Sequence, residues 1–368
     1  MPFESGSVSF RMMELPRAFP KNFAEKFAAH RAGPLDAVGA GEQRGWVTGR
    51  HLLDSKITED SAMHAGWVRL ALRQAERKVP AALLKAECRM EELATMAAEG
   101  KAYLKAKVRA EIRQSVTERL LPNMPPQLRA IPFVYLPGAA HLYVTALATA
   151  PLDVFSAALA STLGFSGTPA TPEALGESLK KVDLRDVPGT SFSPEMEAEA
   201  MEAAPGREFL TWLWFKAETQ NGKVALADGR DLGVLVEGPL TFTHEGNGAH
   251  AAVLKKGSPE NSVEAKTCLL GGKKLKEAKI TFALDEQNLW AFGFEADQFL
   301  IRGLKLPQGE GSMDAISRFQ ERMIFLEQWR EIFLDLFGAF VAVRADAKKW
   351  KNEVADIRAW VKDRPSKR

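Results

Sequence analysis

The chain has 368 residues, of which 46% are hydrophobic and 26% are charged, and its formal net charge at pH 7 is only +2. This composition is typical of a globular protein with ample core, and the length suits two domains or one large domain with appendages. The bulk charge does not indicate a polyanionic partner, and the two cysteines, Cys88 and Cys268, exclude a zinc cluster and a disulfide framework.

The sequence also predicts a compartment. The N-terminus has no signal-peptide pattern, and no apolar run approaches the ~20 residues needed to cross a bilayer. The low cysteine count fits a reducing environment, with both cysteines as small core residues. We therefore expect a cytoplasmic protein with no membrane partner.

The first part of the chain, residues 1–175, is predicted to be an N-terminal α/β part. Its apolar residues form short runs, which are typical of strands, and Gly and Pro residues mark the turns between them. Pro137-Gly138 lies between two such runs and predicts a β-hairpin. Strands are expected at Val8–Leu15, Trp67–Arg73, Phe133–Leu136 and His141–Leu147, with helices through Phe23 and Phe27 and over Pro151–Gly164.

A helical hairpin over 80–121 is predicted to interrupt this part. Pro80 fits the first turn of a helix that ends at Gly100, and a second helix begins at once over Lys101–Pro122. Both helices carry apolar residues at helical spacing. In the first helix the expected buried face is Leu83, Ala86, Met90, Leu93 and Ala97, and in the second it is Leu104, Val108, Ile112, Val116 and Leu120.

A row of basic residues lies beside the apolar stripe of the second helix. Lys101, Lys105, Arg109 and Arg113 repeat every fourth residue, so they share one side of a helix and span roughly 18 Å at 1.5 Å per residue. Duplex DNA carries about one phosphate charge per 1.7 Å of axis, so such a row could face several phosphates. The competing interpretation is a solvated surface, because most charged helix faces contact only water.

The second half of the chain is expected to follow an acidic stretch, Gly189–Pro205, which has few large apolar residues and is predicted to lie at the surface. A β-rich part is predicted over 206–306, and C-terminal helices with a basic tail over 312–364. The segment Phe209–Phe215 is too short to assign to a helix or a strand. Strands are expected at Leu232–Thr243, Ala249–Lys255, Lys279–Leu284, Leu289–Glu295 and Phe299–Leu304, and helices at Ser258–Leu270 and Met313–Phe340.

Positive charge is concentrated in the tail. Nine basic and four acidic residues lie within Arg344–Arg368, which gives +5 for this segment and leaves about −3 for the rest of the chain. Lys348, Lys349 and Lys351 could either contact phosphates or help to pack the tail onto the body. Because tails are usually dispensable for folding, we expect the chain up to Ala342 to fold without it.

The order of these segments from Trp67 onward resembles the RdgC family of recombination-associated DNA-binding proteins. The resemblance is carried by the charged Glu76-Arg77-Lys78 at a strand end, by the basic helix that ends in Leu120-Leu121-Pro122, and by the strands within Ile280–Phe294. It covers roughly Val8 to Phe340. It implies an α+β fold with mixed or antiparallel sheets, an inserted helical hairpin and C-terminal helices.

The resemblance also implies a function. The family is known for a ring-shaped homodimer that encircles double-stranded DNA with little sequence preference and limits access of the RecA recombinase, which would place this protein in the nucleoid. The basic row then corresponds to the family's basic hairpin helix. The DNA-binding residues that we expect are Lys101, Lys105, Lys107, Arg109, Arg113 and Arg129, with Lys348, Lys349 and Lys351 as tail contacts.

One segment departs from the family pattern. Members usually follow Leu-Leu-Pro with a basic residue, a small residue and Phe, which helps to close the ring. Here Pro122 is followed by Asn-Met-Pro-Pro-Gln-Leu. Two alternatives are open: Leu128 with Arg129 replaces the missing residues, or the closure is built differently. If this segment closes the ring, we expect Met124 and Leu128 to make the contact, and the closure to be weaker than usual because these side chains bury less area than Phe.

Catalytic signals in the sequence are weak. Members of the family have been described as exonucleases, and a metal nuclease needs clustered carboxylates that hold Mg²⁺ against phosphate. Glu264-Ala265-Lys266 could end a nuclease motif, but no Pro-Asp precedes it at the usual distance, and the six histidines show no metal-ligand spacing. We expect no enzyme activity, metal or cofactor. The alternatives are a metal-dependent exonuclease and a non-catalytic scaffold protein.

Overall fold

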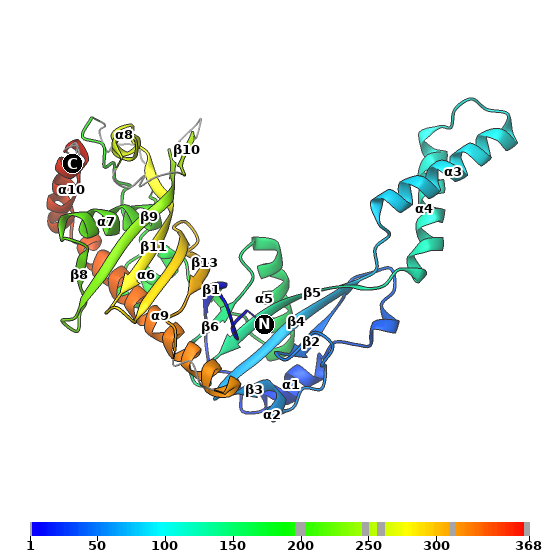
Figure 1. The fold of residues 1–368 in the computed structure, drawn as a ribbon, viewed down its shortest axis with the longest axis horizontal. Coiled ribbons are helices and arrows are strands. Elements are labelled where there is room, and N and C mark those ends of the chain that lie inside the picture. The colour runs from blue at the N-terminus through cyan, green and yellow to red at the C-terminus, as the bar shows by residue number, and fades with distance from the viewer. Residues whose placement is uncertain (1, 196–202, 245–249, 256–261, 310–313, 364–368) are drawn as a thin grey trace.

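A computed structural model describes residues 2–195, 203–244, 250–255, 262–309 and 314–363. Its frame is a 13-stranded antiparallel sheet (Figure 1), which confirms the predicted α+β class. Ten strands follow one another across the sheet in the order β10 (Ala251–Leu254), β9 (Asp231–Thr243), β11 (Lys274–Ala283), β12 (Leu289–Glu295), β13 (Leu300–Lys305), β1 (Val8–Glu14), β6 (His141–Val144), β5 (Gln127–Tyr135), β4 (Trp67–Glu76) and β2 (Gln43–Thr48). Three short strands lie outside this order: β3 (Met63–His64) pairs with β4, β7 (Thr168–Pro169) with β1, and β8 (Lys223–Ala225) with β9.

Strand β1 joins the two halves of this sheet. It pairs with β13 on one side, where Phe10 lies opposite Ile301, and with β6 on the other, where Met12 lies opposite Tyr143. The N-terminal and C-terminal halves therefore share one continuous sheet. The division into parts at 1–175, 206–306 and 312–364 stays a prediction.

The N-terminal half of the sheet is covered on one face by α1 (Phe23–Ala29) and α5 (Thr149–Leu163). The indole of Trp46 on β2 is buried there and donates a 2.7 Å hydrogen bond to Thr162 Oγ1 on α5. Between β5 and β6, Gly138 has a φ of 88°, a conformation that favours glycine, so the predicted β-hairpin is confirmed. Short helical segments complete this half: η1 (Leu35–Ala37), α2 (Glu59–Ala62) and η2 (Leu121–Asn123). Helix α6 (Pro172–Lys180) instead packs into the core of the C-terminal half, where its Leu175 is buried.

The C-terminal half of the sheet packs against α7 (Pro205–Thr219) and α9 (Ala315–Ala345). Phe209–Phe215 belongs to α7 and is buried on all sides, so its sequence shows no amphipathic period from which a helix could be predicted. Two further helices, α8 (Val263–Leu270) and α10 (Ala347–Lys362), complete the layer. Three of the predicted elements begin at Ala249, Ser258 and Met313. These three residues lie outside the part of the chain that the structure describes.

A buried ion cluster holds the C-terminal helices to the sheet. The carboxylate of Glu208 on α7 lies 3.2 Å from Lys274 Nζ on β11 and accepts a 2.7 Å hydrogen bond from Arg344 Nε on α9. It also accepts a 2.9 Å hydrogen bond from the backbone amide of Thr190. Buried charges are stable only when they are paired and hydrogen-bonded, so this cluster fixes α7, α9 and the segment around Thr190 in one arrangement.

Two sequence predictions are wrong in this region. The stretch Gly189–Pro205, expected at the surface, is buried over Thr190–Ser193, and Phe192 lies in the core. The tail, expected to be dispensable, forms α10, and its Trp350 and Trp360 side chains are buried. Both predictions weighed the many charged residues: the first overlooked the single apolar anchor Phe192, and the second overlooked the apolar residues at helical spacing in the tail.

A polar contact joins α9 to the N-terminal half of the sheet. Glu327 on α9 lies 3.1 Å from His141 Nε2 and accepts a 2.7 Å hydrogen bond from the Tyr143 hydroxyl. Burial acts to raise the pKa of Glu327, but the hydrogen bonds from His141 and Tyr143 outweigh it and the pKa lies below its ordinary value. Burial, with the charge of Glu327, raises the pKa of Tyr143. At neutral pH the contact therefore holds an ionised Glu327 and a neutral tyrosine.

The packing of α10 gives a stability prediction. Trp360→Ala should lower the free energy of unfolding by about 3–5 kcal/mol, because the indole packs on Trp214 at a centroid distance of 4.9 Å and donates a 2.8 Å hydrogen bond to Glu218. Lys351→Ala, at an exposed position of the same helix, is the matched control and should change that free energy by less than about 0.5 kcal/mol. Urea unfolding followed by circular dichroism measures both. Equally small effects would show that α10 is not part of the core.

Candidate nucleic-acid interface

The helical hairpin predicted over 80–121 is present and projects from the sheet (Figure 1). Its helices, α3 (Ala81–Glu99) and α4 (Ala106–Leu120), are inserted between the paired strands β4 and β5. The β4–β5 pairing continues as far as Glu76 opposite Gln127, so the hairpin leaves and re-enters the sheet at adjacent strand ends. The sheet therefore sets the position of the foot of the hairpin.

A small core and one arginine attach that foot. Leu84 on α3 and Val116 on α4 are buried in the core between the two helices. Arg77, just after β4, donates a 2.8 Å hydrogen bond from Nε to the carbonyl of Val38 and a further hydrogen bond from its guanidinium to the carbonyl of Met124. The sequence shows Arg77 only as part of a charged strand end and gives no signal of this anchoring role.

The basic row differs from the prediction at its first two positions. Gly100 ends α3 with a φ of 64°, and α4 begins only at Ala106, with Lys105 as its N-cap residue. Lys101 lies in the connecting loop, where its ammonium is 2.7 Å from a carboxylate oxygen of Glu99. The predicted helix start at Lys101 is wrong because two antiparallel helices need a loop between them, and the residues before Lys105 form it.

Four exposed cations at the start of α4 form no ion pair with any described residue. Lys105, Arg109 and Arg113 lie on one side of the helix over roughly 12 Å, and Lys107 lies on another side. Glu111, one turn after Lys107, makes that second side less positive. We call Lys105, Lys107, Arg109 and Arg113 the α4 cations; their charge is available to an anionic ligand.

Other arginines of the hairpin are paired with carboxylates. Arg89 lies 3.4 Å from Glu92, and Arg119 on α4 reaches Glu87 at 3.0 Å and Glu91 at 3.1 Å on α3. Such exposed pairs contribute at most about 1 kcal/mol each to stability, but they compensate the charge of these arginines. Lys85 on α3 is also exposed and has no ion pair among the described residues, but four of the five such cations between residues 81 and 120 lie at the start of α4.

Arg129 lies apart from this group, near the foot of the hairpin on β5. It pairs across the ladder with Gln74. A hydrogen bond from Arg44 lowers the pKa of Glu42, and the charge of Arg129 adds a smaller effect in the same direction. Part of the positive charge of Arg129 is therefore offset by the carboxylate of Glu42.

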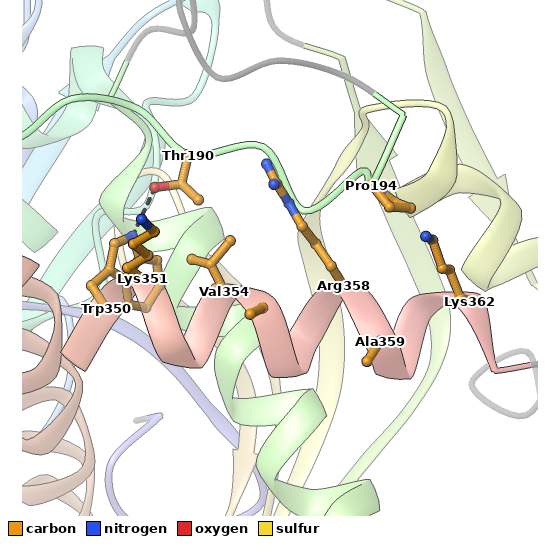
Figure 2. A pocket seen from close by; sticks show the side chains of 9 residues that line it. Thr190, Pro194, Trp350, Lys351, Val354, Arg358, Ala359 and Lys362 are labelled. Carbon is orange, nitrogen blue, oxygen red and sulfur yellow. Dashed lines mark hydrogen bonds between the residues drawn. The ribbon is translucent and has the colours of Figure 1, made fainter. Parts of the chain in front are cut away.

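The three tail lysines lie on α10, at the opposite end of the molecule from the hairpin (Figure 1). Lys348, Lys349 and Lys351 are all exposed. Figure 2 shows Lys351 beside a groove along α10 that Arg358 and Lys362 also line. Lys349 lies 3.6 Å from a carboxylate oxygen of Asp346, and within one chain the three lysines are separate from the α4 cations.

The buried face predicted for the first helix is wrong. Leu83, Met90 and Leu93 are 38%, 59% and 49% exposed, while α3 turns Leu84 and Cys88 towards α4. Both sets of residues have helical spacing and differ in phase by one position, so the sequence alone does not show which set faces α4. Leu83, Met90 and Leu93 therefore keep part of their apolar surface exposed, and we call these three residues the α3 strip.

A comparison with family models bears on this geometry. The model described as "Putative exonuclease, RdgC" matches residues 8–181, which contain the N-terminal half of the sheet and the whole hairpin. This match supports membership of the chain in the RdgC family. This RdgC membership supports a recombination-associated role in DNA binding at the level of the family. None of the curated proteins compared with the chain matches it.

The segment that departs from the RdgC pattern lies at the foot of the hairpin. Met124 is partly buried against the hairpin core, and Leu128 lies on β5 opposite Ala75, where it is partly exposed. Neither side chain is fully buried, so both keep some surface for a further contact.

The exonuclease description of the RdgC family can be compared with the residues of this chain. Lys266 of the Glu264-Ala265-Lys266 sequence is buried and donates 3.0 Å hydrogen bonds to the carbonyls of Trp360 and Asp363, so it caps the end of α10 and does not face a phosphate. The part of the chain that the structure describes holds no group of three or more His, Cys, Asp or Glu residues that could bind a metal ion. Among the same residues, no helix is long and apolar enough to span a membrane.

Proposed function

We propose that this protein binds double-stranded DNA with little sequence preference and that the hairpin makes the main contact. The α4 cations are the observation that supports this proposal most strongly. Charged residues that are paired with carboxylates, such as Arg89 and Arg119, are sufficient to keep a helix soluble. The α4 cations instead present uncompensated charge on an element that projects from the body. Lys101 and Arg129 lie at the margins of the proposed interface.

Contacts to phosphates account for the low sequence preference. Phosphate oxygens are the same in every sequence, whereas sequence readout needs side chains seated at base edges in a groove. Over the roughly 12 Å that Lys105, Arg109 and Arg113 cover, a duplex carries about seven phosphate charges. One subunit supplies only part of the compensating charge, and a second copy of the hairpin would supply more.

We propose that the protein acts as a homodimer in which the α3 strip contacts a second copy. Leu83, Met90 and Leu93 repeat at spacings of seven and three residues, which is the pattern of a seam between paired helices. The chain has the outline of an arc with the hairpin at one end and α10 at the other (Figure 1), so two copies can enclose a space between them. Met124 and Leu128, at the hairpin foot, would lie beside this contact and help to close it.

A dimer closed around DNA would restrain recombination by occupying the duplex. The RecA recombinase would then find less of the DNA accessible, and the protein would be found with the nucleoid. The tail lysines would add weaker phosphate contacts from the other end of each arc. The alternative function is a metal-dependent exonuclease, and the observation that favours it is the word exonuclease in the description of the matching family model.

The first prediction concerns the salt dependence of binding. In the double variant Arg109→Ala/Arg113→Ala, the slope of log affinity against log salt should become shallower by about 0.9 for each phosphate that the protein no longer neutralises, and binding should weaken alike for all sequences. Fluorescence anisotropy with labelled duplex at several salt concentrations measures the slope. Arg89→Ala, on the same hairpin but already paired with Glu92, is the matched control and should leave the slope unchanged. An unchanged slope in the double variant would remove α4 from the interface.

The second prediction concerns the dimer. Met90→Asp/Leu93→Asp should be monomeric at concentrations where the wild type is dimeric, because burying each Leu or Met contributes about 1.5–3 kcal/mol and a buried carboxylate is costly. Both positions are exposed in the single chain, so the fold should be retained. Sedimentation velocity gives the oligomeric state. Leu53→Asp, at a 57% exposed position of the body, serves as the control. A double variant that stays dimeric would place the contact elsewhere.

A further inference from the structure

Among the aromatic side chains of this chain, Tyr103 alone is exposed. The chain has eight Trp, 21 Phe and three Tyr residues, and all of them lie within the described residues. Every Trp is buried, every Phe is buried or partly buried, and Tyr135 and Tyr143 are only 1% and 0% exposed. Tyr103 is 72% exposed. Of the Trp, Phe and Tyr side chains, only that of Tyr103 is therefore exposed to solvent.

This ring lies at the tip of the hairpin. The loop between α3 and α4 is the part of the hairpin furthest from the sheet (Figure 1). Leu104, the next residue, is 5% exposed and holds the loop against the hairpin, which leaves Tyr103 and Lys105 on its outer side. The loop is also fixed at its start, where the backbone amide of Lys101 donates a 3.0 Å hydrogen bond to the carbonyl of Met96.

Three lysines lie close to Tyr103 in the sequence. Lys101, Lys105 and Lys107 lie within four residues of Tyr103, and only Lys101 has a carboxylate partner, Glu99, among the described residues. An aromatic face among lysines fits one ligand chemistry well: a nucleotide whose base stacks on the ring while its phosphates meet the ammonium groups. An acidic peptide would use the lysines but would have no need of the ring.

We infer that Tyr103 stacks on an unpaired DNA base and that the protein consequently prefers a duplex that carries a single-stranded segment. In an intact duplex both faces of each base are covered by neighbouring bases, so a ring at the tip has nothing to stack on. An unpaired base next to a duplex exposes its face. The duplex would lie along the α4 cations and the single strand would continue past the tip. This inference rests on the proposed DNA binding and adds a preferred substrate to it.

The experiment compares three labelled DNAs of equal total length: a blunt duplex, a duplex with a single-stranded overhang, and a single strand. Their affinities for the full-length protein are measured by fluorescence anisotropy at one fixed salt concentration. The wild type should bind the overhang duplex more tightly than the blunt duplex. Tyr103→Ala should weaken binding to the overhang duplex roughly 5- to 150-fold, the range for stacking one base on an aromatic side chain, and leave the blunt duplex nearly unchanged.

Three control variants separate stacking from other effects. Tyr103→Phe keeps the ring and should keep the preference, whereas Tyr103→Leu keeps an apolar side chain without the ring and should lose it. Leu53→Ala, at an exposed apolar position on the body, should change neither affinity. The inference is overturned if Tyr103→Ala weakens both duplexes equally or neither of them while the wild type binds DNA. If the wild type binds none of the three DNAs, the proposed function fails as well.

Discussion

The hairpin depends on the pairing of β4 with β5. Their ladder runs without interruption from Val68 opposite Tyr135 to Glu76 opposite Gln127, and it ends where the hairpin begins. The two chain segments that enter and leave the hairpin are therefore held at the spacing of neighbouring strands. Arg77 reinforces this point by hydrogen bonds to the carbonyl of Val38, before β2, and to the carbonyl of Met124, where the chain leaves the hairpin. A pair of helices with few buried residues of its own is thus positioned by a large sheet.

Charge is distributed differently in the body and in the hairpin. In the C-terminal half, cations are held by carboxylates, as in the buried cluster of Glu208 with Lys274 and Arg344 and in the bidentate contact of Arg207 with Asp297 at 2.6 and 2.9 Å. These pairs fix the relative positions of helices and strands. At the start of α4 the cations have no such role in the described structure. A net charge of only +2 therefore conceals a local excess, and the local excess is what a polyanion would meet.

Much of this arrangement could be predicted from the sequence, because strands and long helices have strong local signals. The hairpin, the antiparallel strands around Ile280–Phe294 and the long helix α9 all follow from periodicity and turn residues. Two features could not be predicted in the same way. The start of α4 depends on how many residues the return loop needs, and the face of α3 depends on which of two adjacent apolar stripes meets α4. Tertiary packing selected Leu84 over Leu83, and no local pattern distinguishes the two. The burial of α10 was predictable in principle, because Trp350, Val354, Ile357 and Val361 have helical spacing.

The central claim is that two copies of this chain enclose duplex DNA, and topology tests it more directly than affinity. A basic groove and a closed ring have similar charge and similar salt dependence, but a ring can leave DNA only by opening or by sliding off an end. The measurement is the rate at which bound protein dissociates in a high-salt challenge, from a covalently closed circle and from the same circle cut once. Our account predicts slower dissociation from the closed circle. Equal rates from the two DNAs would contradict enclosure.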